Sequence, residues 1–228
     1  MKITTIGIDL AKNVFQAHGT DSRGKVLLRK QLRRAQVLPF FARLERCKVA
    51  MEACGSAHYW ARRLQALGFD VMVIAPQYVK PFVKRNKNDV ADAEAICVAA
   101  TRPEMPTVPV KTASQQAILS IHRARQGFVK ARTAQANQIR GLLAEFGFVI
   151  PQGISHLGKS VPEIIEDGDN DLPGSFRLLI LRLLDHLKVL DGQVEELEAE
   201  IVRWHRDRSA RHRPHDGQCA GGLGGRCA

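Results

Sequence analysis

The order of short apolar segments in the first hundred residues constrains the fold most. Residues 3–10, 13–18 and 25–32 have the apolar runs or alternation of strands, and only short polar turns separate them. Strands joined by such turns pair as an antiparallel meander. The segments that follow predict, in order, a helix over 35–46, a strand over 48–53, a helix to about 67, a strand over 70–75 and a helix to about 100. Strands separated by helices are expected to be parallel, so the sequence predicts an α/β domain with a mixed sheet.

Acidic residues stand where two of these strands end. Asp9 closes the first apolar run, and Glu52 closes the fourth strand, which in this topology lies beside the first. Asp89 and Asp92 open the last helix, and their three-residue spacing puts both on one helical face. Sites in open α/β sheets form beyond the carboxyl ends of strands, so we expect these four acids to meet at one edge. A solvated strand-end acid is the alternative reading of Asp9 taken alone.

Four neighbouring carboxylates repel one another unless divalent cations neutralise them. Two Mg²⁺ ions held by such a group activate the attacking oxygen and stabilise the leaving oxygen in phosphodiester chemistry. A strand-end Asp, a strand-end Glu and a helical Asp-x-x-Asp, in this order of elements, form the ribonuclease-H-like arrangement. We therefore expect Asp9, Glu52, Asp89 and Asp92 to be catalytic residues and magnesium ligands.

The charge of the chain indicates a polyanionic partner. Its net charge is +11 and its pI about 9.8, a balance typical of proteins that bind nucleic acid. A membrane surface is the rival, but the sequence lacks the run of roughly 20 apolar residues that spans a bilayer. Between Lys111 and Ala144 there is no acidic residue. The predicted nucleic-acid-binding residues are basic side chains before the acidic helix and along this segment: Lys84, Arg85, Lys87, Arg123, Arg125, Lys130, Arg132 and Arg140.

The second half of the chain predicts a long helical arm over 104–206, after a boundary in a proline-rich stretch. A helix runs over 112–146, with Thr112 or Ser114 as its cap, and residues 147–172 are expected to be irregular. The next helix has apolar residues that alternate spacings of three and four, which is the pattern of a coiled-coil seam: Ile180, Leu183, Leu187, Leu190, Val194, Leu197, Ile201 and Trp204. The two helices are expected to pair as an antiparallel arm, or the second pairs with another chain. The remaining alternative is a helix that packs on its own domain. Residues 207–228 are expected to be a disordered or out-of-frame tail.

Three motifs resemble those of the DEDD-type transposases of the insertion-sequence one-ten family. They are Gly7-Ile-Asp-Leu-Ala-Lys12, Met51-Glu-Ala-Cys-Gly55 and Lys87-Asn-Asp-Val-Ala-Asp-Ala93. The resemblance covers residues 3 to about 205 and implies a RuvC-like domain over 1–103 whose acidic quartet binds Mg²⁺. It also implies DNA transposition by strand cleavage and rejoining in a homo-oligomer built through the coiled-coil arm. Some members are guided by an RNA from the element. The implied location is the bacterial or archaeal cytoplasm, in association with the nucleoid and not with a membrane.

Two features leave alternatives open. Members of that family continue past the arm into a glycine-rich segment with a catalytic serine, so this chain is expected to be truncated or frameshifted, with impaired recombination. A non-catalytic nucleic-acid-binding fragment and a stand-alone RuvC-like junction nuclease are therefore alternatives to an active transposase. Sugar kinases and actin-like ATPases also begin with a strand and Gly-Ile-Asp. They need a glycine and a hydroxyl residue next, where this chain has Leu10-Ala-Lys-Asn13.

Overall fold

The computed structural model describes residues 2–83 and 89–211, with the side chains of 2–83 and 91–208. The chain forms two compact units, Met1–Gln116 and Ala117–Ala228, and the division falls inside the long helix α5 (Ala113–Ala144). Each unit has its own apolar core. The predicted boundary at 103/104 remains a prediction, and the segment just after it packs on the first unit: the N–H of Val108 donates to the carbonyl of Val73 at 2.7 Å.

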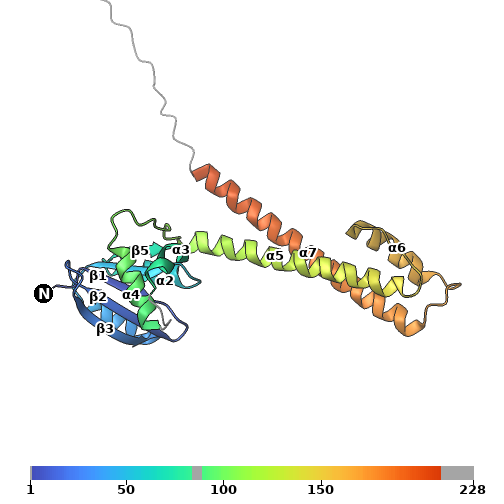
Figure 1. Ribbon diagram of the computed structural model, residues 1–228. Coiled ribbons are helices and arrows are strands. Elements are labelled where there is room, and N and C mark those ends of the chain that lie inside the picture. The colour runs from blue at the N-terminus through green and yellow to red at the C-terminus, as the bar shows by residue number, and fades with distance from the viewer. Residues whose placement is uncertain (1, 84–88, 212–228) are drawn as a thin grey trace, which may run out of the picture. The chain divides into compact units, whose positions relative to one another are not determined.

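A five-stranded mixed sheet forms the centre of the first unit (Figure 1). Its strands are β1 (Thr5–Asp9), β2 (Val14–Thr20), β3 (Val26–Arg33), β4 (Lys48–Glu52) and β5 (Asp70–Ile74). They lie in the order β3-β2-β1-β4-β5, with β1–β2 and β2–β3 antiparallel and β1–β4 and β4–β5 parallel. This is the ribonuclease-H-like topology, and it confirms the α/β class predicted from the sequence.

Helices cover both faces of this sheet. They are η1 (Arg34–Gln36), α1 (Val37–Ala42), α2 (Ala57–Ala66), α3 (Pro76–Val79), η2 (Lys80–Phe82) and α4 (Asp89–Ala100). On one face Ile6, Ile8 and Met51 pack in a core with Phe41 of α1 and Trp60 of α2. On the other face α4 lies across the strands and packs on β1, β2 and β4 (Figure 1). Alternate residues of each strand therefore face different helices.

Glycine at position 7 lets α4 lie directly on β1. A Cβ atom at Gly7 would stand 2.3 Å from the carbonyl oxygen of Ala93 and 2.5 Å from the nitrogen of Cys97. The thiol of Cys97 donates to the carbonyl of Thr5 at 3.7 Å. Burial raises the pKa of this thiol. Since Cys97 lies beside Thr5 and Ala93 beside Gly7, α4 runs antiparallel to β1. Its N-terminus therefore lies toward the carboxyl end of β1.

The second unit is a helical arm. Helix α5 pairs antiparallel with α7 (Gly174–Arg211), with α6 (Ile154–Glu166) beside them (Figure 1). Side-chain bonds follow the pairing: Arg125 to Glu198 at 3.2 Å, and Gln135 to His186 at 2.9 Å. Of the predicted apolar seam, α7 buries Ile180, Leu187, Leu190 and Val194. Helices α5 and α7 therefore pack antiparallel within the chain, and the coiled-coil arm itself stays a prediction.

Thr112 caps α5, as one of the two predicted alternatives. The N–H of Gln115 donates to Thr112 Oγ1 at 3.1 Å, and the N–H of Thr112 donates to Gln115 Oε1 at 2.9 Å. This reciprocal pair is a capping box and satisfies two N–H groups of the first turn. The sequence around Ser114 is already helical.

The prediction that residues 147–172 are irregular is wrong for α6. Pro162 lies inside this helix, where proline costs about 3 kcal/mol relative to alanine. Leu157, Val161 and Ile165 lie at four-residue spacing and are buried in the core of the arm. Burying each such side chain contributes about 1.5–3 kcal/mol, so the stripe outweighs the proline. At the other end of the arm, α7 continues to Arg211, so residues 207–211 are helical, and 212–228 lie outside the described residues.

Candidate functional site

Two acids end neighbouring parallel strands at the same edge of the sheet. Ile8 of β1 pairs with Met51 of β4, and the next residue of each strand is Asp9 and Glu52. Adjacent strands lie about 4.8 Å apart, so the two carboxylates start from neighbouring backbone positions. Because Ile8 and Met51 pack in the core under α1 and α2, Asp9 and Glu52 belong to the opposite face, where α4 lies.

Helix α4 brings two further acids toward this edge. Asp89 precedes the buried Ala93 by four residues, and Asp92 precedes the buried Ile96 by four. Residues four apart share a helical face, so Asp92 belongs to the sheet-facing side of the first turn. That turn lies toward the carboxyl end of β1, and the positive end of a helix dipole favours carboxylates. The Asp89 side chain itself lies outside the described residues.

The donors at this edge suit a hard divalent cation. Carboxylate oxygens from the two strands and from α4 are the ligands that Mg²⁺ takes in proteins. Among the side chains that the structure describes, no three His, Cys, Asp or Glu residues are gathered as a metal-binding group. The assignment of Asp9, Glu52, Asp89 and Asp92 as ligands therefore stays a prediction, supported by strand register and helical phase.

The predicted nucleic-acid-binding residues have different surroundings. Lys84, Arg85 and Lys87 lie outside the described residues. In the arm, Arg123 and Lys130 are exposed.

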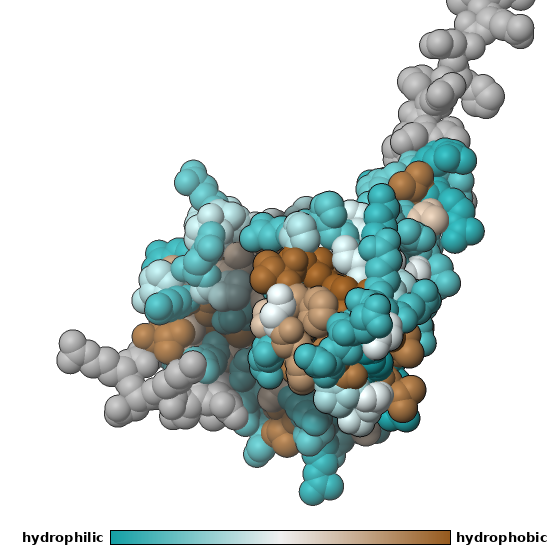
Figure 2. All heavy atoms as spheres, turned by 90° about the vertical axis from the view of Figure 1, so that its right-hand side faces the viewer, coloured by the Kyte–Doolittle hydropathy of each residue, from teal (hydrophilic) through white to brown (hydrophobic). Residues whose placement is uncertain are grey.

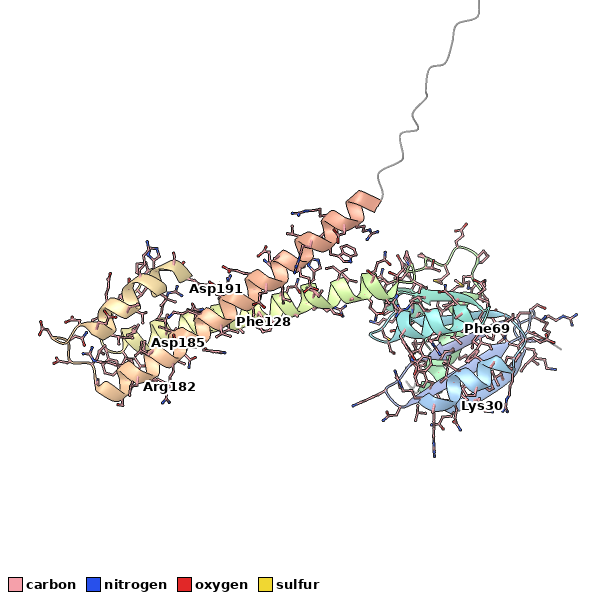
Figure 3. The ribbon with its side chains drawn as sticks, turned by 180° about the vertical axis from the view of Figure 1, so that it is seen from behind. Lys30, Phe69, Phe128, Arg182, Asp185 and Asp191 are labelled. Carbon is pink, nitrogen blue, oxygen red and sulfur yellow. The ribbon has the colours of Figure 1, made fainter. Side chains whose placement is uncertain are left out.

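The other three predicted residues of the arm make bonds within it. Arg125 pairs with Glu198, and Arg132 pairs with Asp191, which Figure 3 labels on α7. Arg140 donates to the carbonyls of Pro151 and Gly153 at 3.2 and 2.8 Å. These arginines hold α5 to α7 and to the connection before α6. Arg125 and Arg132 are paired with acids, and Arg140 is engaged by neutral carbonyl groups.

A histidine clamp ties the segment before α5 to α2. The backbone N–H of Lys111 donates to Nδ1 of His58 at 3.3 Å, and Lys111 Nζ lies 2.8 Å from Nε2. Arg62 Nη1 donates to the carbonyl of Lys111 at 2.6 Å. Burial, with the charges of Lys111 and Arg62, lowers the pKa of His58, so the imidazole is neutral near pH 7. Sequence analysis gave no sign of this clamp, since its partners are far apart in the chain.

A family model described as a transposase, that of the DEDD transposases of IS110, matches residues 6–148. The chain belongs to this transposase family. The match includes both strand-end acids, the two acids of α4 and all of α5.

Relatives carry the same description. The chain is 50% identical over 202 residues to a probable family 20 transposase of Pseudomonas aeruginosa, covering 88% of this chain and 60% of that protein. It is 44% identical over 201 residues to the transposase for insertion sequence element IS1328 of Yersinia enterocolitica, covering 87% and 59%. It is 38% identical over 199 residues to the transposase for insertion sequence element IS1111A of Coxiella burnetii, covering 87% and 55%. The chain thus spans about 60% of the length of the first two relatives.

Among solved structures, RuvC of T. thermophilus in complex with a Holliday junction substrate aligns with 15% identity and a TM-score of 0.33. The alignment covers 44% of this chain and 94% of that one. Over the described ranges 2–83 and 89–211, no helix has the length and apolarity needed to cross a membrane.

Proposed function

We propose that this transposase chain carries out metal-dependent cleavage and rejoining of DNA strands, with Asp9, Glu52, Asp89 and Asp92 as the magnesium ligands. The observation that carries the proposal is the meeting of two adjacent parallel strands, each ending in an acid, with the acidic first turn of α4. The proposed site draws its carboxylates from three elements that are remote in sequence.

Mg²⁺ at such a group would polarise the scissile phosphate and lower the pKa of an attacking hydroxyl. The chain's own contribution is placement. Asp9 and Glu52 are anchored on hydrogen-bonded central strands, which hold their backbones rigidly. Asp89 and Asp92 depend on how closely α4 lies on β1, and Gly7 sets that distance. The carboxylates would hold the cations beside the reacting phosphate, and the helix N-terminus offsets part of their mutual repulsion.

DNA is the proposed partner, and the net charge of +11 supports it. On the arm, the exposed Arg123 and Lys130 are the proposed phosphate contacts, in preference to Arg125, Arg132 and Arg140, which hold the arm together. Use of a guide RNA stays a prediction from the resemblance.

Self-association through the arm is also proposed. Leu178 and Val189 are exposed on the side of α7 opposite the buried Ile180 and Leu187, and Leu181 is exposed on its flank. Figure 2 shows apolar side chains gathered on the face of the arm turned toward the viewer. Exposed apolar side chains grouped in this way commonly mark a protein interface.

The test of the catalytic proposal is Mg²⁺-dependent nicking of supercoiled DNA by the whole chain. Glu52→Gln should abolish nicking, whereas Asp70→Asn should leave it unchanged. Asp70 is exposed at the amino end of β5, whereas the proposed ligands Asp9 and Glu52 lie at the carboxyl ends of β1 and β4. Equal nicking by Glu52→Gln would contradict the assignment. If the unaltered chain binds DNA but does not nick it, the non-catalytic alternative is correct.

A further inference from the structure

The edge strand β3 carries basic residues on the same sheet face as the carboxylates. Leu28 and Leu32 of β3 pack into the core under α1 and α2. Residues alternate across a strand, so Arg29, Gln31 and Arg33 turn to the opposite face, which is the face of α4. All three are exposed.

Strand register places these residues in line with the candidate metal site. Asp9 pairs with Gln16 of β2, and Gln16 pairs with Gln31 of β3. Neighbouring positions across β4, β1, β2 and β3 are therefore Glu52, Asp9, Gln16 and Gln31. Two neighbouring strand spacings put the Gln31 backbone about 10 Å from that of Asp9. Arg29 and Arg33 stand two residues to either side of Gln31, opposite His18 and Val14 of β2.

The positive charge of this face has no acidic counterpart nearby in the sequence. Neither β2 nor the segment from Ser22 to Leu44, which includes β3 and α1, contains an Asp or Glu. In the arm, by contrast, Glu198 and Asp191 of α7 pair with Arg125 and Arg132 of α5. Arg34 is not part of the set, because its guanidinium lies 5.2 Å from the Trp60 ring and donates to the carbonyl of Lys12.

We propose that Arg29 and Arg33 bind the phosphate backbone of the DNA strand whose scissile phosphate lies at Asp9 and Glu52. Residues four apart on a strand are about 13 Å apart, so the two guanidinium groups contact separate phosphates. Gln16 and Gln31 lie between them and offer neutral hydrogen bonds to the same backbone. The inference rests on the proposed function, because the metal site fixes where the DNA strand begins its path across β2 and β3.

The matched control lies on the same strand. Lys30, labelled in Figure 3, stands between Arg29 and Gln31 but belongs to the other sheet face, with its Nζ 4.9 Å from the centre of the Phe40 ring of α1. Lys30→Gln removes one positive charge from β3 without touching the proposed track. Arg29→Gln and Arg33→Gln each remove the same charge from the face of the carboxylates.

The experiment measures affinity for a DNA duplex by fluorescence anisotropy over a salt series, with Ca²⁺ in place of Mg²⁺ to prevent cleavage. Each arginine variant should make the slope of log K against log salt less negative by about 0.9, and the double variant by about 1.8. At low salt the double variant should bind roughly tenfold or more weakly, while Lys30→Gln should keep the slope of the unaltered chain. Urea unfolding of all variants checks that β3 is intact.

Three results would overturn the proposal. The first is a salt slope that is unchanged in the double variant. The second is a change of slope in Lys30→Gln equal to that of a single arginine variant, because this would indicate a non-specific effect of charge. A loss of affinity for an RNA hairpin but not for the DNA duplex is the third. Failure of the metal-site proposal is distinguishable, because it appears as unchanged Mg²⁺ binding in Asp9→Asn, whereas Arg29→Gln and Arg33→Gln should leave Mg²⁺ binding unaltered.

Discussion

The sheet unit and the helical arm use arginine in different ways. In the arm, Arg125 and Arg132 project from α5 onto Glu198 and Asp191 of α7 and form part of the pairing between the helices. On β3 of the sheet unit, Arg29 and Arg33 are exposed on a face whose neighbouring strand has no acid. A basic stretch therefore indicates a nucleic-acid surface only when the element packed against it does not neutralise the charge.

The same contrast holds for glycine. Gly7 on β1 and Gly127 on α5 both lie inside regular elements, but a Cβ atom at Gly7 would overlap the backbone of α4, whereas one at Gly127 would meet nothing within 4 Å. The contact between β1 and α4 thus leaves no space for a methyl group at position 7, whereas α5 has space for one at position 127.

The largest expected effect comes from Gly7→Ala. The helix backbone cannot move away without losing buried contacts, so we expect a loss of about 3 kcal/mol in the free energy of unfolding of the sheet unit, at the upper end for overpacked cores. Gly127→Ala should instead stabilise the arm by up to about 1 kcal/mol, because alanine is the better helix former. Urea denaturation of both variants measures the difference. Equal, small effects would show that α4 is not held against β1.

An intermediate effect is expected from removing single positive charges from α5. Arg132→Gln leaves Asp191 without its partner in a partly exposed pair and should lower the stability of the arm by about 1 kcal/mol. It should leave the salt slope of DNA binding unchanged. Lys130→Gln should do the reverse, with unchanged stability and a slope less negative by about 0.9. Thermal unfolding and a salt titration of both variants separate the two roles. A changed salt slope for Arg132→Gln would show that Arg132 contacts DNA.

The smallest expected effect is the pH dependence of the clamp at His58. Its pKa in the folded chain is lowered from the ordinary 6.5, chiefly by burial and also by Lys111 and Arg62. As the pH falls through 6.5, the unfolded chain takes up a proton that the folded chain resists, so stability is present above that pH and declines below it. Melting temperatures at pH 7.5 and 5.5 should differ less for His58→Gln than for the unaltered chain. His156→Gln, at an exposed position in the arm, is the control.

Much of the sheet unit is predictable from its sequence, because its elements are short and strongly patterned. The apolar runs ending at Asp9 and Glu52, and the turns between the first three strands, fix both the strand order and the edge where the acids lie. The alternation of Leu28, Lys30 and Leu32 with Arg29 and Arg33 could also have indicated the basic face of β3. The sequence prediction placed the basic surface on residues 111–144 instead, because the segment without acidic residues is longer there.

The remaining features depend on contacts between distant residues. Nothing near Arg132 in the sequence reveals that Asp191 will neutralise it, because the pairing of α5 with α7 brings the two together. The helix α6 was missed because Gly153, Gly158 and Pro162 are local helix breakers, while the buried stripe that stabilises it needs the other two helices as partners. Tertiary burial overrides local preference in this segment.

The central claim is that Asp9 holds a magnesium ion, and isothermal titration calorimetry of the whole chain with Mg²⁺ tests it most directly. We expect Asp9→Asn to remove most of the binding heat, and Asp92→Asn to weaken it. Asp70→Asn should bind as the unaltered chain does, because its carboxylate stands at the opposite edge of the same sheet. Mg²⁺ binding that is unchanged in Asp9→Asn would contradict the account.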